Sequence, residues 1–303
     1  MGEGNSIINL GGLGKPATVL IQKISNAVGG LCQPWQIKRV AQAEAEASLI
    51  AAKSEIKVTE LQKRAFGRFI NEEAKKQQNM EDVAAKALPH LTDNSQPEKL
   101  DDDWVTNFFD KCRNVSDKNM QDLWSKVLAG EANSPGTYSK RTVNLIEALD
   151  QKDATLFAKL CGFAWMIGRV TPLVLDLEHK IYTDAGINFE SLLHLNNIGL
   201  VSFESTTGLV LQGLKKSIGL NYYGQAYVLE FAQPEANRLD IGKVMLTQAG
   251  GELARICASQ PVPGFGEFML QRWCALGYSI SSPYISILGD GWRGTSVDSV
   301  VAK

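Results

Sequence analysis

The sequence has few of the residues and motifs that usually reveal a chemical reaction. Its three histidines are far apart, and its five cysteines, an odd number, form no CxxC pair and no cluster with histidine. Scattered cysteines of this kind are typical of free thiols in a reducing compartment. No nucleophile elbow, paired-carboxylate signature or HExxH motif is present. We therefore expect no catalytic residues, no bound cofactor or metal ion, and no enzymatic activity.

Strong charge of one sign is also missing. The net charge is only −2, so the chain as a whole does not attract nucleic acid or anionic lipid, and any such contact needs a local patch. The glycine-rich stretch at 11–16 lacks the spacing of a nucleotide-binding phosphate loop. The first residues have no basic region followed by a long apolar one. We therefore expect no secretory signal and a cytoplasmic protein, with the surface of the inner membrane as an alternative location.

Proline and glycine are almost absent between Pro34 and Pro89, where Gly67 is the one glycine. The stretch is rich in Ala, Glu and Lys, which lose little on entering a helix. If it is helical throughout, it spans roughly 80 Å at about 1.5 Å per residue, much longer than an ordinary globular helix. We expect a long Ala-rich helix over 34–90, with Gly67 or the polar stretch 75–79 as places where it could divide in two.

Small apolar residues recur at helical spacing in the first half of this stretch. Such a seam lets a second helix approach closely, and we expect self-association through Ala41, Ala45, Leu49 and Ala52. The larger side chains near the other end, Phe66, Phe69 and Ile70, indicate a segment anchored in a larger core. A self-associating rod and a helical hairpin are both compatible with this pattern.

An amphipathic helix is expected over 17–32, within an N-terminal segment 1–33. We expect its apolar face to contact a membrane or a partner through Leu20, Ile24, Val28 and Leu31. At about sixteen residues the helix is too short to cross a bilayer, which takes roughly 20 apolar residues. The alternative is that the same face packs on the chain's own helices or on a sister subunit.

A helical domain is expected over 91–170. Apolar residues at helical spacing, several of them preceded by capping residues, predict helices over 99–115, 116–129, 139–149 and 151–169. Trp124 lies on the apolar face of the second helix and is expected in the core. Glu131 and Arg141 flank the turn at 135–136, and an ion pair between them is expected to brace it.

The rest of the chain is richer in glycine, and its helical runs are shorter. Short strands, at 209–211 and 227–231 among others, and helices over 246–256 and 265–276 predict a winged-helix-like α+β module over 171–288, followed by a flexible tail over 289–303. Lys215 and Lys216 are candidates for nucleic-acid contact from the wing of this module. A solvated loop is the plainer explanation for two lysines.

Three segments carry a resemblance to a known family: MQDLWSKVLAGE (120–131), PGTYSKRTV (135–143) and IEALDQKDA (146–154). This block resembles one shared by a bacterial family of unknown function that is similar to the abortive-infection Abi-alpha proteins. Two further stretches, GGLCQPWQIKRVAQAEA (29–45) and LTQAGGEL (246–253), extend the resemblance over most of 17–258. The resemblance implies phage defence by growth arrest or killing of the infected cell, and it supplies no catalytic residues.

The expected fold is mostly α: a long N-terminal helix and a helical domain, with a small α+β winged-helix-like C-terminal module. The expected function is that of a non-enzymatic phage-defence effector, or a component of one, which forms homo-oligomers and acts through self-assembly, with membrane perturbation as a further means. The alternative is a regulatory or adaptor protein whose winged-helix-like module binds nucleic acid or a partner protein.

Overall fold

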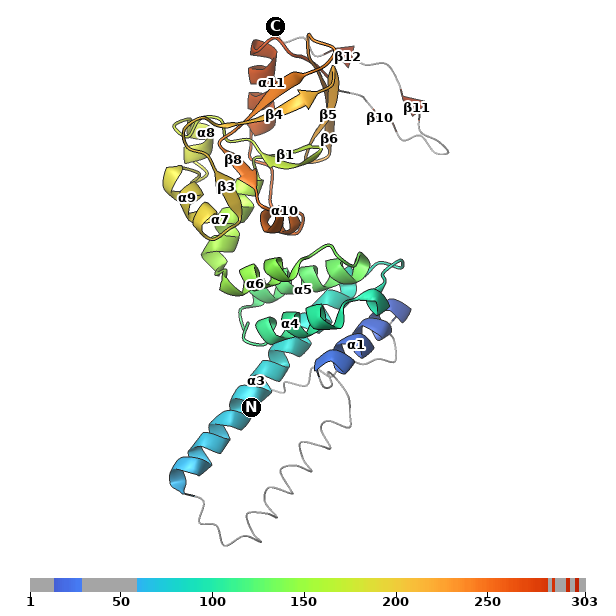
Figure 1. Cartoon of the computed structure of the whole chain (residues 1–303), viewed down its shortest axis with the longest axis vertical. Helices are drawn as coiled ribbons and strands as arrows, with labels where there is room; N and C mark the ends of the chain where they lie inside the picture. The colour runs from blue at the N-terminus through green and yellow to red at the C-terminus, as the bar shows by residue number, and fades with distance from the viewer. Residues whose placement is uncertain (1–13, 29–58, 283–284, 287–292, 295–297, 300–303) are drawn as a thin grey trace. The chain divides into compact units, whose positions relative to one another are not determined.

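The computed structural model describes residues 14–28, 59–282, 285–286, 293–294 and 298–299 of the chain (Figure 1). The chain divides into two compact units, residues 1–148 and residues 149–303. The described part of the first unit is helical, and the second unit combines short helices with an antiparallel sheet. The fold is therefore mixed α/β, and the expectation of a mostly α fold is wrong.

The single long helix expected over 34–90 is also wrong, because a helix begins inside that stretch. Helix α3 (Glu60–Ala87) starts after the N-cap residue Thr59, whose backbone is extended (φ −65°, ψ 154°). The Thr59 hydroxyl accepts a hydrogen bond from the Gln62 N–H (3.3 Å), and the Gln62 side chain accepts one from the Thr59 N–H (2.9 Å). This capping box satisfies N–H groups that a helix start leaves unpaired, so it fixes the boundary.

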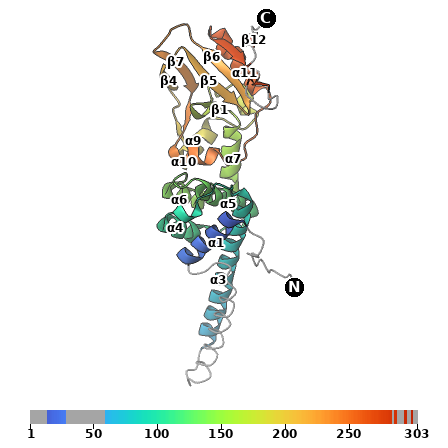
Figure 2. The same cartoon turned by 90° about the vertical axis from the view of Figure 1, so that its right-hand side faces the viewer.

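The first unit packs α4 and α5 against α3, and all the buried residues of α3 lie in its second half (Figures 1 and 2). Helix α3 contacts α5, α1 contacts α4 and the turn η3, and α4 contacts α6. The bounds of these elements are α1 (Lys15–Val28), η2 (Leu88–His90), η3 (Pro97–Lys99), α4 (Asp102–Cys112), α5 (Lys118–Asn133) and α6 (Lys140–Ala148). The helices predicted over 99–115, 116–129 and 139–149 are thus confirmed as α4, α5 and α6, with shifted ends.

An aromatic cluster forms the core of this unit. Trp104, Phe108 and Trp124 are buried. The Phe108 ring stacks on Trp104 with 5.1 Å between ring centroids and meets Trp124 edge to face at 5.0 Å. The Trp104 indole N–H donates to the Tyr138 carbonyl (2.7 Å), so the cluster also holds the chain just before α6.

The turn between α5 and α6 is held by Glu131, a buried carboxylate. Its two oxygens accept hydrogen bonds from the N–H groups of Gly136 (2.6 Å) and Tyr138 (2.7 Å). Arg141, which was expected to brace this turn with Glu131, is exposed on α6. Charge-assisted bonds from a buried carboxylate to backbone N–H groups are strong, so the turn is fixed by Glu131 and the backbone.

The second unit is built around an antiparallel sheet with the strand order β12-β9-β6-β5-β1-β2 (Figure 1). Separate two-stranded ladders join β3 to β8, β4 to β7 and β10 to β11. The strands are β1 (Ala164–Ile167), β2 (Arg169–Pro172), β3 (Val201–Phe203), β4 (Leu209–Leu214), β5 (Ser217–Tyr222), β6 (Gln225–Glu230), β7 (Asn237–Gly242), β8 (Val244–Leu246), β9 (Ser279–Ser282), β10 (Ile285–Ser286), β11 (Arg293–Gly294) and β12 (Asp298–Ser299). The helices are α7 (Gln151–Cys161), α8 (Lys180–Thr183), α9 (Phe189–Asn197), α10 (Gln248–Ala254) and α11 (Phe265–Ala275).

The helix predicted over 151–169 is too long, and this error hid the sheet. Helix α7 ends at Cys161, and the chain turns at Gly162 into β1. From Phe163 onward burial alternates: Phe163, Trp165 and Ile167 are buried, whereas Met166 is 45 % exposed. This period of two belongs to a strand. Because β1 pairs with β5, the sheet starts before residue 171, and a small winged-helix-like module does not describe it.

We expect Trp124→Ala to destabilise the first unit by about 3 to 5 kcal/mol, because the change removes a fully buried aromatic side chain and leaves a cavity. Thermal and denaturant unfolding of the full chain, followed by circular dichroism, measures the effect. Trp124→Phe retains the ring contact with Phe108 and should cost much less. Equal stability of Trp124→Ala and the wild type would contradict the core assignment.

Two neighbouring glycines of α10, Gly250 and Gly251, provide a test substitution and its control. A Cβ atom at Gly250 would lie 1.9 Å from the Leu200 carbonyl oxygen, whereas one at Gly251 would meet nothing within 4 Å. We expect Gly250→Ala to lower the free energy of unfolding by about 1 to 3 kcal/mol through overpacking. Gly251→Ala should raise it by up to about 1 kcal/mol, since alanine favours a helix. The same unfolding experiments test both variants. Equal changes in the free energy of unfolding would contradict the close approach of Gly250 to the Leu200 carbonyl.

Candidate functional site

The first half of α3 exposes large apolar side chains. Every residue from 60 to 69 is exposed, and the exposed fraction is 69 % for Leu61, 54 % for Phe66 and 58 % for Phe69. Figures 1 and 2 show this end of the helix extending beyond α1, α4 and α5 of the same unit. The expectation that Phe66, Phe69 and Ile70 are anchored in a larger core is therefore wrong for the described residues. An exposed apolar helix face of this kind often marks an interaction site.

Most of the large apolar residues share one side of α3 with two opposite charges. Lys63, Phe66, Ile70 and Glu73 follow each other at spacings of three, four and three residues, which places them on one face of a helix. Phe69 flanks the same face. We call these five residues the α3 seam. Leu61 lies about 140° around the helix from Phe66 and belongs to a different face.

The charges of the α3 seam are paired only locally in the structure. The Lys63 ammonium lies 2.9 Å from Glu60, and the Glu73 carboxylate lies 2.5 Å from Lys76. Both pairs join residues three apart on one helix and are open to solvent. Such pairs contribute only a few tenths of a kcal/mol, so Lys63 and Glu73 can change partners at little cost.

The residues expected to meet a membrane or partner belong to α1. Leu20 and Ile24 are fully buried, Val28 is partly exposed, and Leu31 lies outside the described residues. The helix packs on α4, and the Lys23 ammonium lies 2.6 Å from the Asp102 carboxylate. The structure therefore supports the alternative in which this face packs on the chain's own helices. The expected self-association residues Ala41, Ala45, Leu49 and Ala52 all lie outside the described part of the chain.

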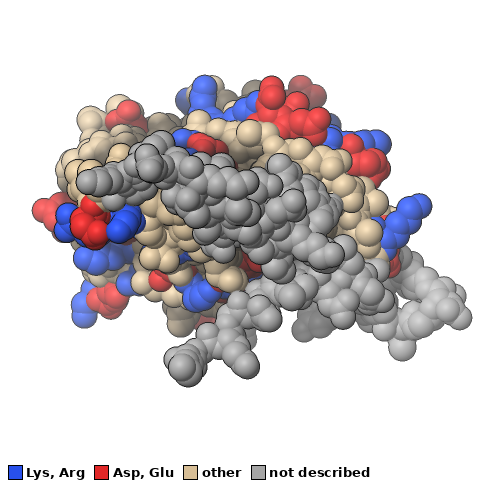
Figure 3. All heavy atoms as spheres, turned by 90° about the horizontal axis from the view of Figure 1, so that it is seen from below, with Lys and Arg blue, Asp and Glu red and all other residues tan. Residues whose placement is uncertain are grey.

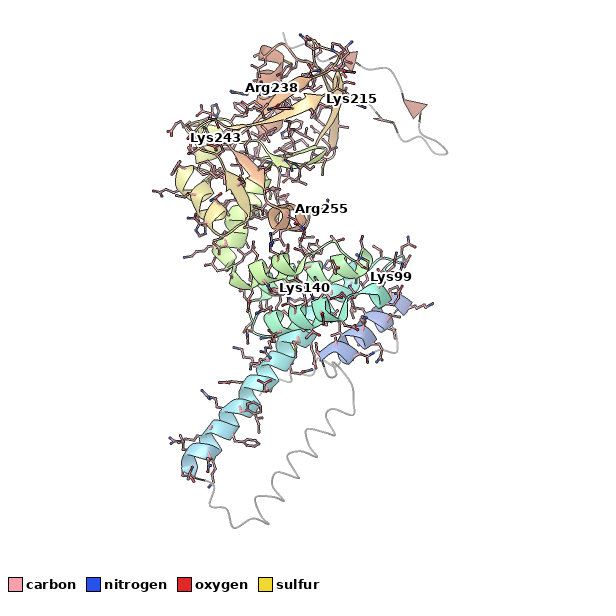
Figure 4. The ribbon with its side chains drawn as sticks, viewed as in Figure 1. Lys99, Lys140, Lys215, Arg238, Lys243 and Arg255 are labelled. Carbon is pink, nitrogen blue, oxygen red and sulfur yellow. The ribbon has the colours of Figure 1, made fainter. Side chains whose placement is uncertain are left out.

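Lys215 and Lys216 are exposed in the connection between β4 and β5. The Asn237 side chain donates to the Lys215 carbonyl (3.3 Å) and so fixes this connection. Figure 4 labels Lys215, Arg238 and Lys243 on the second unit, and Arg238 directly follows Asn237, which pairs with Leu214 across β4 and β7. On the face drawn in Figure 3, basic and acidic side chains are intermixed. The structure thus places the two lysines together in an exposed connection, with Arg238 on the neighbouring strand.

A histidine and a carboxylate meet where α9 packs on α7. The His194 Nε2 atom lies 2.6 Å from the Asp153 Oδ1 atom, and Asp153 also accepts from the Asp150 N–H (3.1 Å) in the capping box of α7. Burial acts to raise the pKa of Asp153, but the hydrogen bonds from His194 and Asp150 outweigh it and lower the pKa. In the described part of the chain no three His, Cys, Asp or Glu residues form a group that could hold a metal ion.

None of the helices in the described ranges combines the length and the apolar character needed to span a bilayer.

We expect the Asp153 carboxylate to stabilise the second unit in a pH-dependent way. Because its pKa is lower in the folded chain than its ordinary value of 3.8, its contribution is present above that pH and is lost as the pH falls through the lowered pKa. Asp153→Asn should melt below the wild type at pH 6, and the difference should shrink towards zero below pH 3. A difference that stays constant over this range would contradict the ion-pair assignment.

Comparison with known proteins gives one match. A family model described as "Protein of unknown function (DUF2806)" matches residues 63–269, which run from the α3 seam into α11. No curated protein and no solved structure matches the chain.

Proposed function

The chain belongs to the DUF2806 family of proteins of unknown function, and we propose that it is a non-enzymatic, self-assembling component of a phage-defence system. The proposal rests on one observation, the exposed α3 seam with Phe66 and Phe69 more than half exposed. The expected occupant of the seam is the α3 helix of a second copy. This proposal places the assembly surface further along the chain than the alanine residues at 41–52.

The charges and the apolar residues of the seam are arranged to suit an antiparallel copy. Lys63 and Glu73 lie at equal distances from position 68, and so do Phe66 and Ile70. A two-fold axis at this position therefore brings Lys63 of one copy opposite Glu73 of the other, and Phe66 opposite Ile70, with both contacts made twice. The two Phe69 side chains meet beside the axis. A parallel arrangement would instead bring like charges together, which is unfavourable.

The energetics predict an assembly that depends on concentration. Three large apolar side chains from each copy, already partly covered, would gain about 1 kcal/mol or somewhat more apiece. Association costs roughly 4 kcal/mol or more in lost translational and rotational freedom. The net gain is at most a few kcal/mol, which corresponds to a dissociation constant of about a millimolar or weaker, so we expect a weak dimer that dissociates on dilution rather than a permanent one. Such a dimer can respond to a rise in local protein concentration.

The defence role is proposed by analogy: residues 120–154 resemble a block of a bacterial family of unknown function that is similar to the Abi-alpha proteins, and this resemblance implies growth arrest or death of the infected cell. Residue chemistry adds nothing to this part of the proposal, since Trp124 and Glu131 within that block hold the fold of the first unit. We do not extend the proposal to membrane perturbation by α1, because Leu20 and Ile24 are fully buried.

An adaptor role is the second candidate. The observation that favours it is the exposed connection between β4 and β5, where Lys215 and Lys216 project from a backbone fixed by Asn237. A partner carrying phosphate or carboxylate groups suits two adjacent lysines. Loss of binding to DNA or RNA on changing both lysines to Ala, with steep salt dependence in the wild type, distinguishes this role from self-assembly.

We expect Phe66→Glu to weaken self-association at least tenfold, because it puts an unpaired charge into the apolar contact. Light scattering and sedimentation of the full chain from about 10 μM to millimolar concentrations measure the dissociation constant. Leu61→Glu is the matched control, since it alters an even more exposed apolar residue of α3 outside the seam, and it should leave association unchanged.

A charge exchange tests the antiparallel register. Lys63→Glu alone and Glu73→Lys alone each place like charges opposite one another twice, so each should weaken association. The double variant restores opposite charges and should recover most of it. A wild type that stays monomeric up to millimolar concentration would contradict the proposal. Phage challenge of cells with the wild type and with Phe66→Glu links assembly to survival, and equal survival would remove the defence role.

A further inference from the structure

Two cysteines far apart in the sequence meet in the second unit, independently of the α3 seam. Cys161 ends α7 and is buried, whereas Cys257 follows α10 and is partly exposed. The Cys257 thiol donates to the Ala254 carbonyl (3.4 Å), and the two thiols lie near enough to shift each other's pKa. No CxxC spacing signals this pair, so the sequence alone suggested only scattered free thiols. A pair of contacting thiols with one member open to solvent has the layout of a redox site.

Tyr223 and Ser259 hold the two cysteine segments together. The Tyr223 hydroxyl lies 3.1 Å from the Cys161 carbonyl oxygen and 2.6 Å from the Ser259 hydroxyl. Ser259 in turn offers both its backbone N–H and its hydroxyl to the Cys257 sulfur. Ala258 between them has a φ of 54°, a left-handed conformation that is costly for alanine. Backbone strain of this kind tends to occur at functional sites.

These hydrogen bonds give the two sulfur atoms different acidities. The bond from the Cys161 thiol lowers the pKa of Cys257 to about 7, against the effect of burial, and the bonds from Ser259 lower it further in the same direction. The pKa of Cys161 is raised, first by its bond to Cys257 and then by burial. At neutral pH, a substantial fraction of the partly exposed Cys257 is therefore thiolate, and Cys161 is a buried neutral thiol.

We propose that Cys257 and Cys161 form a peroxide-reactive site, in which Cys257 is oxidised by a small hydroperoxide and Cys161 then closes a reversible disulfide. The Cys257 thiolate attacks one oxygen of hydrogen peroxide, the O–O bond breaks, and a water molecule leaves after protonation, which gives a sulfenic acid. The Cys161 sulfur attacks the sulfenic sulfur, the S–O bond breaks, and the Cys161 proton leaves with the hydroxide as water. Two thiols are oxidised to one disulfide, and one hydrogen peroxide is reduced to two water molecules.

The product would tie the end of α7 to the segment after α10. The sulfur atoms of a disulfide are about 2.05 Å apart, so the two cysteine side chains must approach each other before the bond closes. We expect the segment of Cys257 to move, because Cys257 is the more exposed of the two cysteines. A bond that closes so large a loop restricts the unfolded chain strongly, and the oxidised second unit should melt higher by on the order of 10 °C.

The test uses the full chain at pH 7.5, treated with a few equivalents of hydrogen peroxide and then with an alkylating reagent. Mass spectrometry of proteolytic peptides should find a linkage between the peptides of Cys161 and Cys257, which dithiothreitol reverses. The melting temperature should rise on oxidation and fall back on reduction. Alkylation of Cys257 in the untreated protein should accelerate as the pH rises through about 7.

Three variants separate the roles. Cys161→Ala should stop the reaction at the sulfenic acid of Cys257, which dimedone captures with a defined mass increase. Cys257→Ser should abolish both the linkage and the dimedone product while leaving the fold intact, which keeps the test valid if Cys161→Ala does not fold. Cys274→Ser alters a partly exposed cysteine outside the pair and should change nothing. The proposal is overturned if no linkage forms, if Cys257 and Cys274 oxidise at equal rates, or if Cys257 links to Cys32 instead.

Discussion

The fold of the second unit depends on a close approach between two backbone segments, the end of α7 at Gly162 and the segment 260–262. The Tyr222 hydroxyl donates to the Gly162 carbonyl (2.8 Å) and accepts from the Val262 N–H (3.0 Å), so one side chain joins three segments. A Cβ atom at Gly162 would lie 2.7 Å from the Gln260 carbonyl oxygen. Only glycine allows this approach without displacement. The helix therefore ends here, β1 enters the sheet beside β5, and Cys161 is brought to the segment that carries Cys257.

Local signals decided which parts of the fold the sequence could predict. The helices α4, α5, α6 and α11 combine apolar spacing with capping residues or glycine boundaries, and their positions were predicted within a few residues. All residues of 163–167 are apolar, so the sequence shows no alternation of apolar and polar residues there. It therefore does not distinguish a strand from a segment of buried helix. The capping box at Thr59 and Gln62 is visible in the sequence, but strong helix formers on both sides concealed it.

The candidate sites were harder to predict, because exposure depends on which neighbour covers a residue. Phe66 and Phe69 look like core residues by composition, yet they are exposed, and the buried residues of α3, which α4 and α5 contact, lie in its second half. Leu20 and Ile24 have the pattern of a membrane-binding face, and only the packing of α1 on α4 shows that this face is covered. The thiol pair is separated by 96 residues (161 to 257), a distance at which no spacing rule applies.

The order of contacts along the chain has a consequence for biosynthesis. The helices of the first unit pack on one another using residues up to 148, whereas the sheet of the second unit joins β1 to β5 and closes only when β6 pairs with β9, at residues 279–281. Local helical contacts form faster than such distant strand pairings, and domains near the amino terminus fold first on the ribosome. The α3 helix is thus exposed while the second unit is still being translated. Under the proposed self-assembly, copies made on one messenger RNA would meet through nascent chains before their fold is complete.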